Sequence, residues 1–150
     1  MDVRARRAPV LASLLVACAA ILSGCGGTKE QTASGGSSAA CLSDVSRVLL
    51  PRGFPSAFPF PPTTVVHAVR PLPGGYKVLH SRLHGEIESA RDYVMRELPR
   101  AGFNLGQGDA EEQEAETDFS GHGISGRLKL HTLLGCPGAL TLDVAYRAKD

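Results

Sequence analysis

Hydrophobic residues are arranged in two different ways along this chain. Near the N-terminus they form one continuous run, in which residues 8–22 are apolar apart from Ser13. From residue 63 onward they recur in short periodic segments separated by glycine, proline and charged residues. The continuous run is about 15 residues long, shorter than the roughly 20 that a membrane-spanning helix needs. Because basic residues precede it and small residues follow it, the run predicts a secretion signal.

The periodic segments begin with two predicted strands and a helix. Residues 63–69 are mostly β-branched, residues 73–75 form a Pro-Gly-Gly turn signal, and residues 76–83 predict the second strand. Residues 86–98 predict a helix, because apolar side chains recur there every three or four positions. These positions are Ile87, Ala90, Val94, Leu98 and, just beyond, Ala101. Pro99 and Gly102 predict the end of the helix.

Residues 111–133 alternate so regularly that they predict a β-hairpin together with its register. Acidic residues occupy every second position from Glu112 to Asp118. Basic residues occupy every second position from Arg127 to His131. A two-residue turn at His122-Gly123 suits the positive φ angles of a type I′ turn. This turn sets Asp118 opposite Arg127, Glu116 opposite Lys129 and Glu114 opposite His131. We interpret the carboxylates as a cross-strand charge ladder and not as Ca²⁺ ligands, because they are too widely spaced along one strand.

Residues 139–146 supply a further strand, and the elements together predict an α+β fold. We expect two layers, in which one helix packs on an antiparallel sheet in the order β-β-α-β-β-β. Residues 47–62 are dense in proline and phenylalanine, which excludes a helix or a central strand there. We interpret Phe54, Phe58 and Phe60 as a strap over the core; the alternative is an exposed ligand-binding lip.

The end of the apolar run resembles the lipobox of bacterial lipoprotein precursors. Leu22-Ser23-Gly24-Cys25 has the leucine, the two small residues and the cysteine of that motif. The resemblance covers residues 1–25. It implies that the sulfur of Cys25 carries a diacylglyceryl group, whose two acyl chains anchor the protein to a membrane, and that the chain is cut before this cysteine. Residues 15–18 (Leu-Val-Ala-Cys) fit the same pattern but would leave a shorter apolar run and an apolar mature N-terminus.

The sequence divides into three predicted segments. Residues 26–40 are small and polar, without hydrophobic periodicity, and predict a flexible tether. The chain therefore divides into a signal peptide (1–24), the lipidated cysteine with its tether (25–40) and a single globular domain (41–150).

Four cysteines occur in the chain, and two of them belong to the globular domain. Cys18 leaves with the signal peptide and Cys25 is lipidated, so Cys41 and Cys136 remain. Two cysteines in an exported domain most simply form one disulfide.

Charge and composition exclude several classes of partner. Three of the 16 basic residues and one of the 15 acidic residues lie in the first 24 positions, so the exported part is close to neutral. We therefore expect no binding of nucleic acid and no polybasic patch for acidic lipids. The chain has no Trp and few other aromatic residues, which argues against base-stacking or sugar-stacking platforms.

No motif predicts a catalytic, cofactor or metal site. Residues 121–126 match the letters of the GxGxxG dinucleotide fingerprint, but an alternating strand follows where a helix is required. His80 and His84 lie on a predicted strand about 13 Å apart, too far to share one ion, so we expect them to face solvent. His67 is within reach of His80 across the first hairpin, but a third ligand is not evident.

The segments GFPSAFPFPP, the GHG turn and GCPGA give the globular domain a characteristic sequence. Over about residues 53–147 it resembles small secreted proteins of high-GC Gram-positive bacteria that have no assigned function, so the resemblance implies no activity. We expect a non-enzymatic binding or interaction module that faces outward from the cell membrane, with an envelope protein or a small ligand as its partner. The alternative is a structural or accessory subunit of an envelope complex, docking through the strap or the sheet edge.

Replacing Cys25 by alanine should abolish incorporation of a labelled fatty acid into the protein in growing cells, because the acyl chains are attached through this residue. Cys18→Ala is the matched control and should leave labelling unchanged. Label retained in the Cys25 variant, together with label lost from the Cys18 variant, would refute the assignment.

Overall fold

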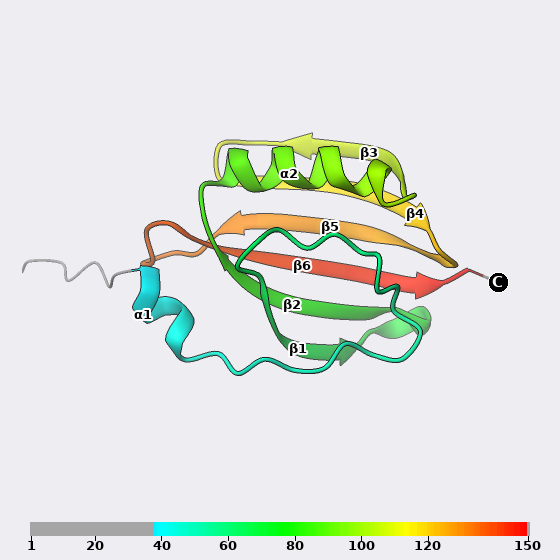
Figure 1. Ribbon diagram of the computed structural model, residues 1–150, viewed down its shortest axis with the longest axis horizontal. Helices are drawn as coiled ribbons and strands as arrows, with labels where there is room; N and C mark the ends of the chain where they lie inside the picture. The colour runs from blue at the N-terminus through cyan, green and yellow to red at the C-terminus, as the bar shows by residue number, and fades with distance from the viewer. Residues whose placement is uncertain (1–37, 150) are drawn as a thin grey trace, which may run out of the picture. The chain divides into compact units, whose positions relative to one another are not determined.

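The computed structural model describes residues 38–149, which form a six-stranded antiparallel sheet and one long helix (Figure 1). The helices are α1 (Ser38–Ser43), the short 3-10 helix η1 (Pro73–Gly75) and α2 (Ile87–Arg100). The strands are β1 (Val65–Pro71), β2 (Lys77–His84), β3 (Asn104–Ala110), β4 (Glu114–Gly121), β5 (Ile124–Thr132) and β6 (Ala139–Ala148). The predicted α+β class is therefore confirmed, with sheet predominating. The lipidation site Cys25 and the predicted tether up to residue 37 lie outside the described residues.

The last strand of the chain, β6, occupies the middle of the sheet. The strand order is β1-β2-β6-β5-β4-β3, so β6 pairs with β2 on one side and with β5 on the other. The β6 residues that face the core are Leu140, Leu142, Val144 and Tyr146. Thr141 and Asp143 alternate with them and lie on the opposite face. β6 therefore joins the β1–β2 hairpin to the strands β3, β4 and β5 in one continuous sheet.

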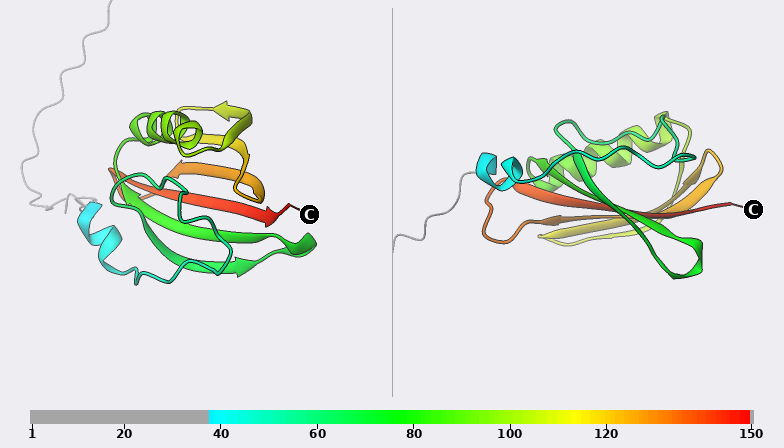
Figure 2. Two further views of the ribbon diagram at one scale, coloured as in Figure 1. Left: turned by 45° about the vertical axis from the view of Figure 1, so that its right-hand side comes forward. Right: turned by 90° about the horizontal axis from the view of Figure 1, so that it is seen from below.

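One face of the sheet is covered by α2 and by the proline-rich strap of residues 47–62 (Figure 2). Phe54 and Phe58 of the strap are only 8% and 5% exposed. The Phe58 ring centroid lies 5.4 Å from that of Phe119, and the Phe54 ring centroid lies 4.8 Å from that of Tyr146. The strap interpretation is confirmed and the exposed lip is wrong, since burying these rings removes a large apolar area from water.

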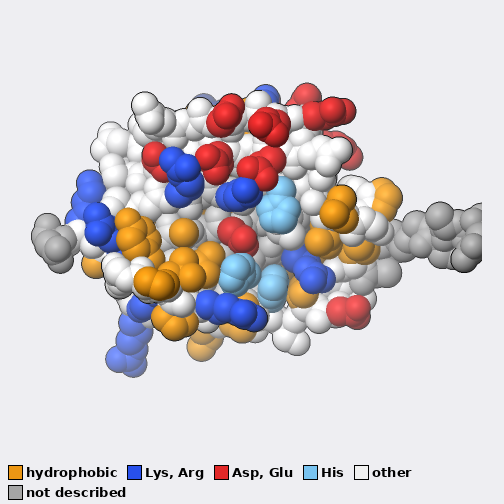
Figure 3. Space-filling model, turned by 180° about the vertical axis from the view of Figure 1, so that it is seen from behind, with side chains coloured by type: hydrophobic (Ala, Val, Ile, Leu, Met, Phe, Trp, Pro, Cys, Tyr) orange, Lys and Arg blue, Asp and Glu red, His pale blue; other side chains and the backbone are white. Residues whose placement is uncertain are grey.

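The other face of the sheet carries charged and polar side chains (Figure 3). Acidic residues of β4 lie beside basic residues of β5, and histidines gather around a carboxylate near the middle of the face. None of the helices within residues 38–149 is both long enough and apolar enough to cross a membrane.

The hairpin of β4 and β5 has the register that the sequence predicts, with Asp118 opposite Arg127 and Glu116 opposite Lys129. His122 and Gly123 form the turn, with φ angles of 50° and 76°. The predicted ion pair between Asp118 and Arg127 is present, with Arg127 Nε 2.7 Å from Asp118 Oδ1. Two further ion pairs connect diagonal neighbours. Lys129 Nζ lies 2.6 Å from Glu114 Oε1, and Arg127 Nη1 lies 3.0 Å from Glu116 Oε1. Diagonal side chains on paired strands are still within reach of long basic residues.

The sheet has one strand more than the predicted order β-β-α-β-β-β, because β3 was not recognised from the sequence. Gly106 and Gly108 interrupt its pattern, and glycine is depleted in strands. Pairing with β4 requires them: a Cβ added to Gly108 would lie 2.6 Å from the carbonyl oxygen of Glu116. The helix α2 ends at Arg100, between the predicted end signals Pro99 and Gly102 and two residues beyond the predicted range 86–98.

The predicted disulfide between Cys41 and Cys136 is present, with the two Cα atoms 6.1 Å apart and a sequence separation of 95. It connects α1 to the loop that leads into β6. Arg82 of β2 donates a hydrogen bond from Nη1 to the carbonyl oxygen of Cys41 at 2.9 Å. Because α1 begins at Ser38, the predicted domain boundary between residues 40 and 41 falls within a helix.

The diagonal ion pairs predict which charges are energetically coupled in the hairpin. A double-mutant cycle with Glu114→Gln and Lys129→Gln should give a larger coupling free energy than the matched cycle with Glu116→Gln and Lys129→Gln. The coupling should decrease with added salt, because both pairs are exposed. Urea unfolding of the parent, single and double variants measures both cycles. Equal couplings, or a larger one for the directly opposed pair, would show that the diagonal pairing is not populated.

Candidate functional site

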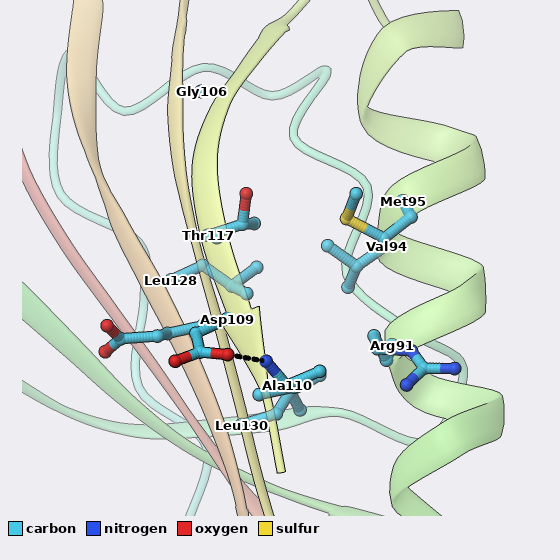
Figure 4. Close-up of a pocket in the computed structure, with 12 residues that line it drawn as sticks. Arg91, Val94, Met95, Gly106, Asp109, Ala110, Thr117, Leu128 and Leu130 are labelled. Atoms are coloured by element: carbon cyan, nitrogen blue, oxygen red, sulfur yellow. Dashed lines mark hydrogen bonds between the residues drawn. The ribbon is translucent and has the colours of Figure 1, made fainter.

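An apolar pocket of about 390 Å³ lies between α2 and the strands β3, β4 and β5 (Figure 4). Ligand-binding pockets in proteins have volumes of roughly 300–1,000 Å³ and are lined mainly by apolar side chains. We call this the helix–sheet pocket. Sequence analysis did not predict it, because its walls come from elements that are adjacent only after folding.

Side chains from α2 and β5 form two opposite walls of the helix–sheet pocket. Val94 and Met95 point from α2 toward the sheet, and Leu128 and Leu130 face them from β5 (Figure 4). Val94, Leu128 and Leu130 are at most 2% exposed, whereas Met95 is 43% exposed. The pocket is therefore apolar in its interior, with the flexible thioether of Met95 at its rim.

β3 explains why this space is empty. Its contribution to the pocket includes Gly106 and Gly108. A Cβ added to Gly108 would lie 3.1 Å from the Cβ of Thr117, which also lines the pocket, so the missing side chain leaves the gap below α2 unfilled. A Cβ added to Gly106 would lie 2.8 Å from the Cβ of Asp118, so the close pairing of β3 with β4 excludes a larger residue there. The same glycines that concealed the strand in the sequence thus leave the pocket open.

The polar groups around the helix–sheet pocket are already engaged. Arg91 donates from Nη2 to Asp92 Oδ1 at 3.0 Å, and the backbone N–H of Ala110 donates to Asp109 Oδ1 at 2.8 Å. The hydroxyl of Thr117 donates to the carbonyl oxygen of Asp118 at 3.3 Å. Chemically, the pocket is suited to hold an apolar group and offers few unpaired polar atoms to it.

A second, shallow hollow lies on the polar face of the sheet. We call it the polar hollow and define it by His67, Arg70, His80, Arg82, His131, Thr141 and Asp143. These side chains come from β1, β2, β5 and β6, so the central position of β6 brings them together. The sequence analysis named His67 and His80 but gave no role to Thr141 or Asp143.

As expected, His80 is on the face of the sheet that α2 and the strap do not cover. Its side chain is nevertheless only 31% exposed, and its Nδ1 lies 2.9 Å from Asp143 Oδ1. The two residues are directly opposed on β2 and β6. The pair arises from a strand neighbour 63 residues away, which local sequence pattern does not reveal.

His67 lies at an irregularity in the pairing of β1 with β2, where the register shifts between Val66 and Ala68. Such bulges redirect side chains. Burial lowers the pKa of the His67 imidazole below its ordinary value of 6.5, and the nearby charges of Arg82 and His80 lower it further. The surroundings of His67 are thus positively charged, as its predicted proximity to His80 implies.

Within residues 38–149, no three histidine, cysteine, aspartate or glutamate side chains are arranged to hold a metal ion. The disulfide joins Cys41 to Cys136, and the third predicted site residue, Cys25, lies outside the described range.

Comparisons of the chain with protein-family models, with curated proteins and with solved structures found no match.

The lowered pKa of His67 predicts a contribution to acid destabilisation. A histidine whose folded-state pKa lies below its unfolded value binds fewer protons when folded, so stability falls as the pH decreases through about 6.5. His67→Gln should therefore make the melting temperature less dependent on pH between about pH 7 and about pH 5. His84→Gln, outside the polar hollow, is the control and should keep the parent's profile. A steeper profile in the His67 variant would contradict the assignment.

Proposed function

We propose that this protein is an outward-facing, lipid-anchored component of the cell envelope that binds a small, mainly apolar ligand and catalyses no reaction. The observation that carries the ligand proposal is the helix–sheet pocket of about 390 Å³. The proposed location rests on the lipobox residues 22–25 and the basic and apolar segments before them. We take the architecture as two layers, with α2 and the strap on the apolar face of the sheet and the ligand between the layers.

The lining of the helix–sheet pocket supports an apolar ligand. Leu128 and Leu130 are buried by the fold, yet they border unfilled space. An apolar group that enters removes their surface and its own from water, which is favourable in proportion to the area buried. Met95 at the rim can adjust its unbranched side chain to ligands of different shape.

The polar groups at the pocket support binding without catalysis. Arg91, Asp109 and Thr117 each have a hydrogen-bond partner on their own or an adjacent strand or helix. Nucleophilic catalysis requires a nucleophile within reach of a base. Among the described residues that line the pocket, the one hydroxyl is that of Thr117, and it donates to the backbone carbonyl oxygen of Asp118 and not to a base.

The predicted tether supports access to the pocket from outside the membrane. As a flexible chain, the twelve tether residues that precede α1 (26–37) have a root-mean-square reach on the order of 20 Å. A tether of this reach lets a small domain stand clear of the lipid headgroups. The proposed ligand would therefore be a soluble or partly soluble molecule of the envelope space.

The alternative function is that of an accessory subunit that docks through the sheet edge. β3 is an outer strand of the sheet, and every residue of it except Leu105 is exposed. An unpaired strand edge is a template for a strand from another protein. Docking through the strap is less favoured, since Phe54 and Phe58 are buried in the core.

Binding of anilinonaphthalene sulfonate, a dye that fluoresces in apolar sites, tests the pocket directly. The full chain in a non-ionic detergent below its micelle concentration should bind the dye saturably, and decanoate should displace it. Ala115→Leu places a larger side chain in the pocket and should weaken binding by about tenfold or more, equivalent to about 1.4 kcal/mol. Ala145→Leu, on the polar face, is the matched control and should bind like the parent.

The stability of the same variants provides an independent check. Overpacking a filled core destabilises a protein by about 1–3 kcal/mol, whereas a side chain that enters an existing cavity does not. Ala115→Leu should therefore retain the parent's melting temperature. Absence of saturable dye binding, or equal affinities in the two variants, would overturn the ligand proposal. Crosslinking to a partner through β3 in intact cells would then favour the accessory subunit.

A further inference from the structure

The polar hollow lies on the face of the sheet opposite the helix–sheet pocket, and its chemistry is different. It contains two guanidinium groups, three imidazoles, a threonine hydroxyl and a single carboxylate. The hollow has a volume of about 440 Å³ and opens to solvent (Figure 3). Its contents therefore favour an anion over a cation or an apolar group.

The carboxylate of Asp143 already has a hydrogen-bond partner in His80, whose Nδ1 lies 2.9 Å from it on β2. Lys129 is directly opposite on β5 but pairs with Glu114. Two arginines remain whose charges are not paired with a carboxylate among the described residues. Arg82 donates from Nη1 to the neutral carbonyl oxygen of Cys41, which orients its guanidinium without neutralising it. Arg70 is exposed at the edge of the hollow on β1.

Thr141 supplies a polar atom that lacks a partner. Its Oγ1 is buried and has no hydrogen-bond partner within the described part of the chain. In the strand register, Thr141 lies between Arg82 on β2 and His131 on β5. A buried hydroxyl without a partner is unfavourable, and an acceptor oxygen bound between these side chains would relieve it.

We propose that the polar hollow binds an oxyanion of the phosphate or sulfate type, with Arg70 and Arg82 as the charged donors and the Thr141 hydroxyl as a further donor. Guanidinium groups match the geometry of such oxyanions with two parallel hydrogen bonds. His67 and His131 border the same space and add positive charge when they are protonated. The bulge in β1 contributes here, because His67 is the extra residue between Val66, which pairs with Ser81, and Ala68, which pairs with His80.

Binding should strengthen as the pH falls, because the imidazoles gain protons. The charged and titratable groups that face the hollow are His67 and Arg70 of β1, His80 and Arg82 of β2, Asp143 of β6, Lys129 and His131 of β5, and Glu114 of β4. Glu114 is paired with Lys129 at 2.6 Å. The remaining carboxylate, Asp143, is therefore the main group that opposes an anion.

Sulfate is the best probe, since its charge does not change across the pH range of histidine titration. Imidazole NMR signals of the full chain in non-ionic detergent, at constant ionic strength against chloride, should shift saturably for His67, His80 and His131. Affinity should rise about two- to fivefold per proton gained between about pH 8 and about pH 6, as expected for partly exposed charges. Shifts no larger than those in chloride would overturn the proposal.

Three variants test the assigned roles. Thr141→Val should weaken sulfate binding about two- to fivefold without lowering the melting temperature, because the hydroxyl has no partner to lose. Asp143→Asn should tighten binding by removing the opposing charge. Arg96→Gln, on α2, is the matched control and should bind like the parent. An unchanged affinity in the threonine variant, or weaker binding in the aspartate variant, would overturn the site.

A final comparison identifies the source of the oxyanion. Inorganic phosphate should compete with sulfate at these signals if the site takes a free anion. Glycerophosphoglycerol, the soluble headgroup of an anionic phospholipid, should compete at lower concentration if the site takes a lipid headgroup. Failure of both to displace sulfate would overturn the assignment to the phosphate class.

Discussion

The pairing of β6 with both β2 and β5 is the interaction on which the rest of this structure depends. β2 ends at His84 and β5 begins only at Ile124, and β6 joins them through continuous antiparallel pairing. On one face, Leu142 and Val144 complete the core, where both are fully buried. On the other face, Thr141 and Asp143 connect the histidines of β1 and β2 to that of β5. One strand therefore organises the apolar core and the polar hollow at once.

The two hollows of the domain arise from different physical causes. The helix–sheet pocket exists because glycines in β3 permit close pairing with β4 and leave no side chains below α2. The polar hollow exists because alternation along four strands directs polar side chains to a face that α2 and the strap do not cover. Since the sheet separates them, occupation of one does not exclude occupation of the other. A protein held at the membrane by its N-terminus would then present two chemically distinct sites.

The hairpin of β4 and β5 and the strand β3 show where sequence reasoning succeeds and where it fails. The hairpin was predictable to the residue because its strands are adjacent in sequence and a one-residue slip would reverse every face. β3 was missed because Gly106 and Gly108 carry no hydrophobic pattern. The diagonal pairing of Lys129 with Glu114 also escaped prediction, since opposed positions in a register do not specify which long side chains meet.

The sequence by itself determined the α+β class, the β4–β5 register and the pairing of Cys41 with Cys136. These depend on local periodicity, on hydrophobicity and on the number of cysteines available, all of which are written along the chain. Only the tertiary structure decided that β6 lies between β2 and β5, that His80 meets Asp143 and that a pocket remains below α2. The physical reason is that these features join residues far apart in sequence, whose proximity depends on how strands and helix pack and not on any local pattern.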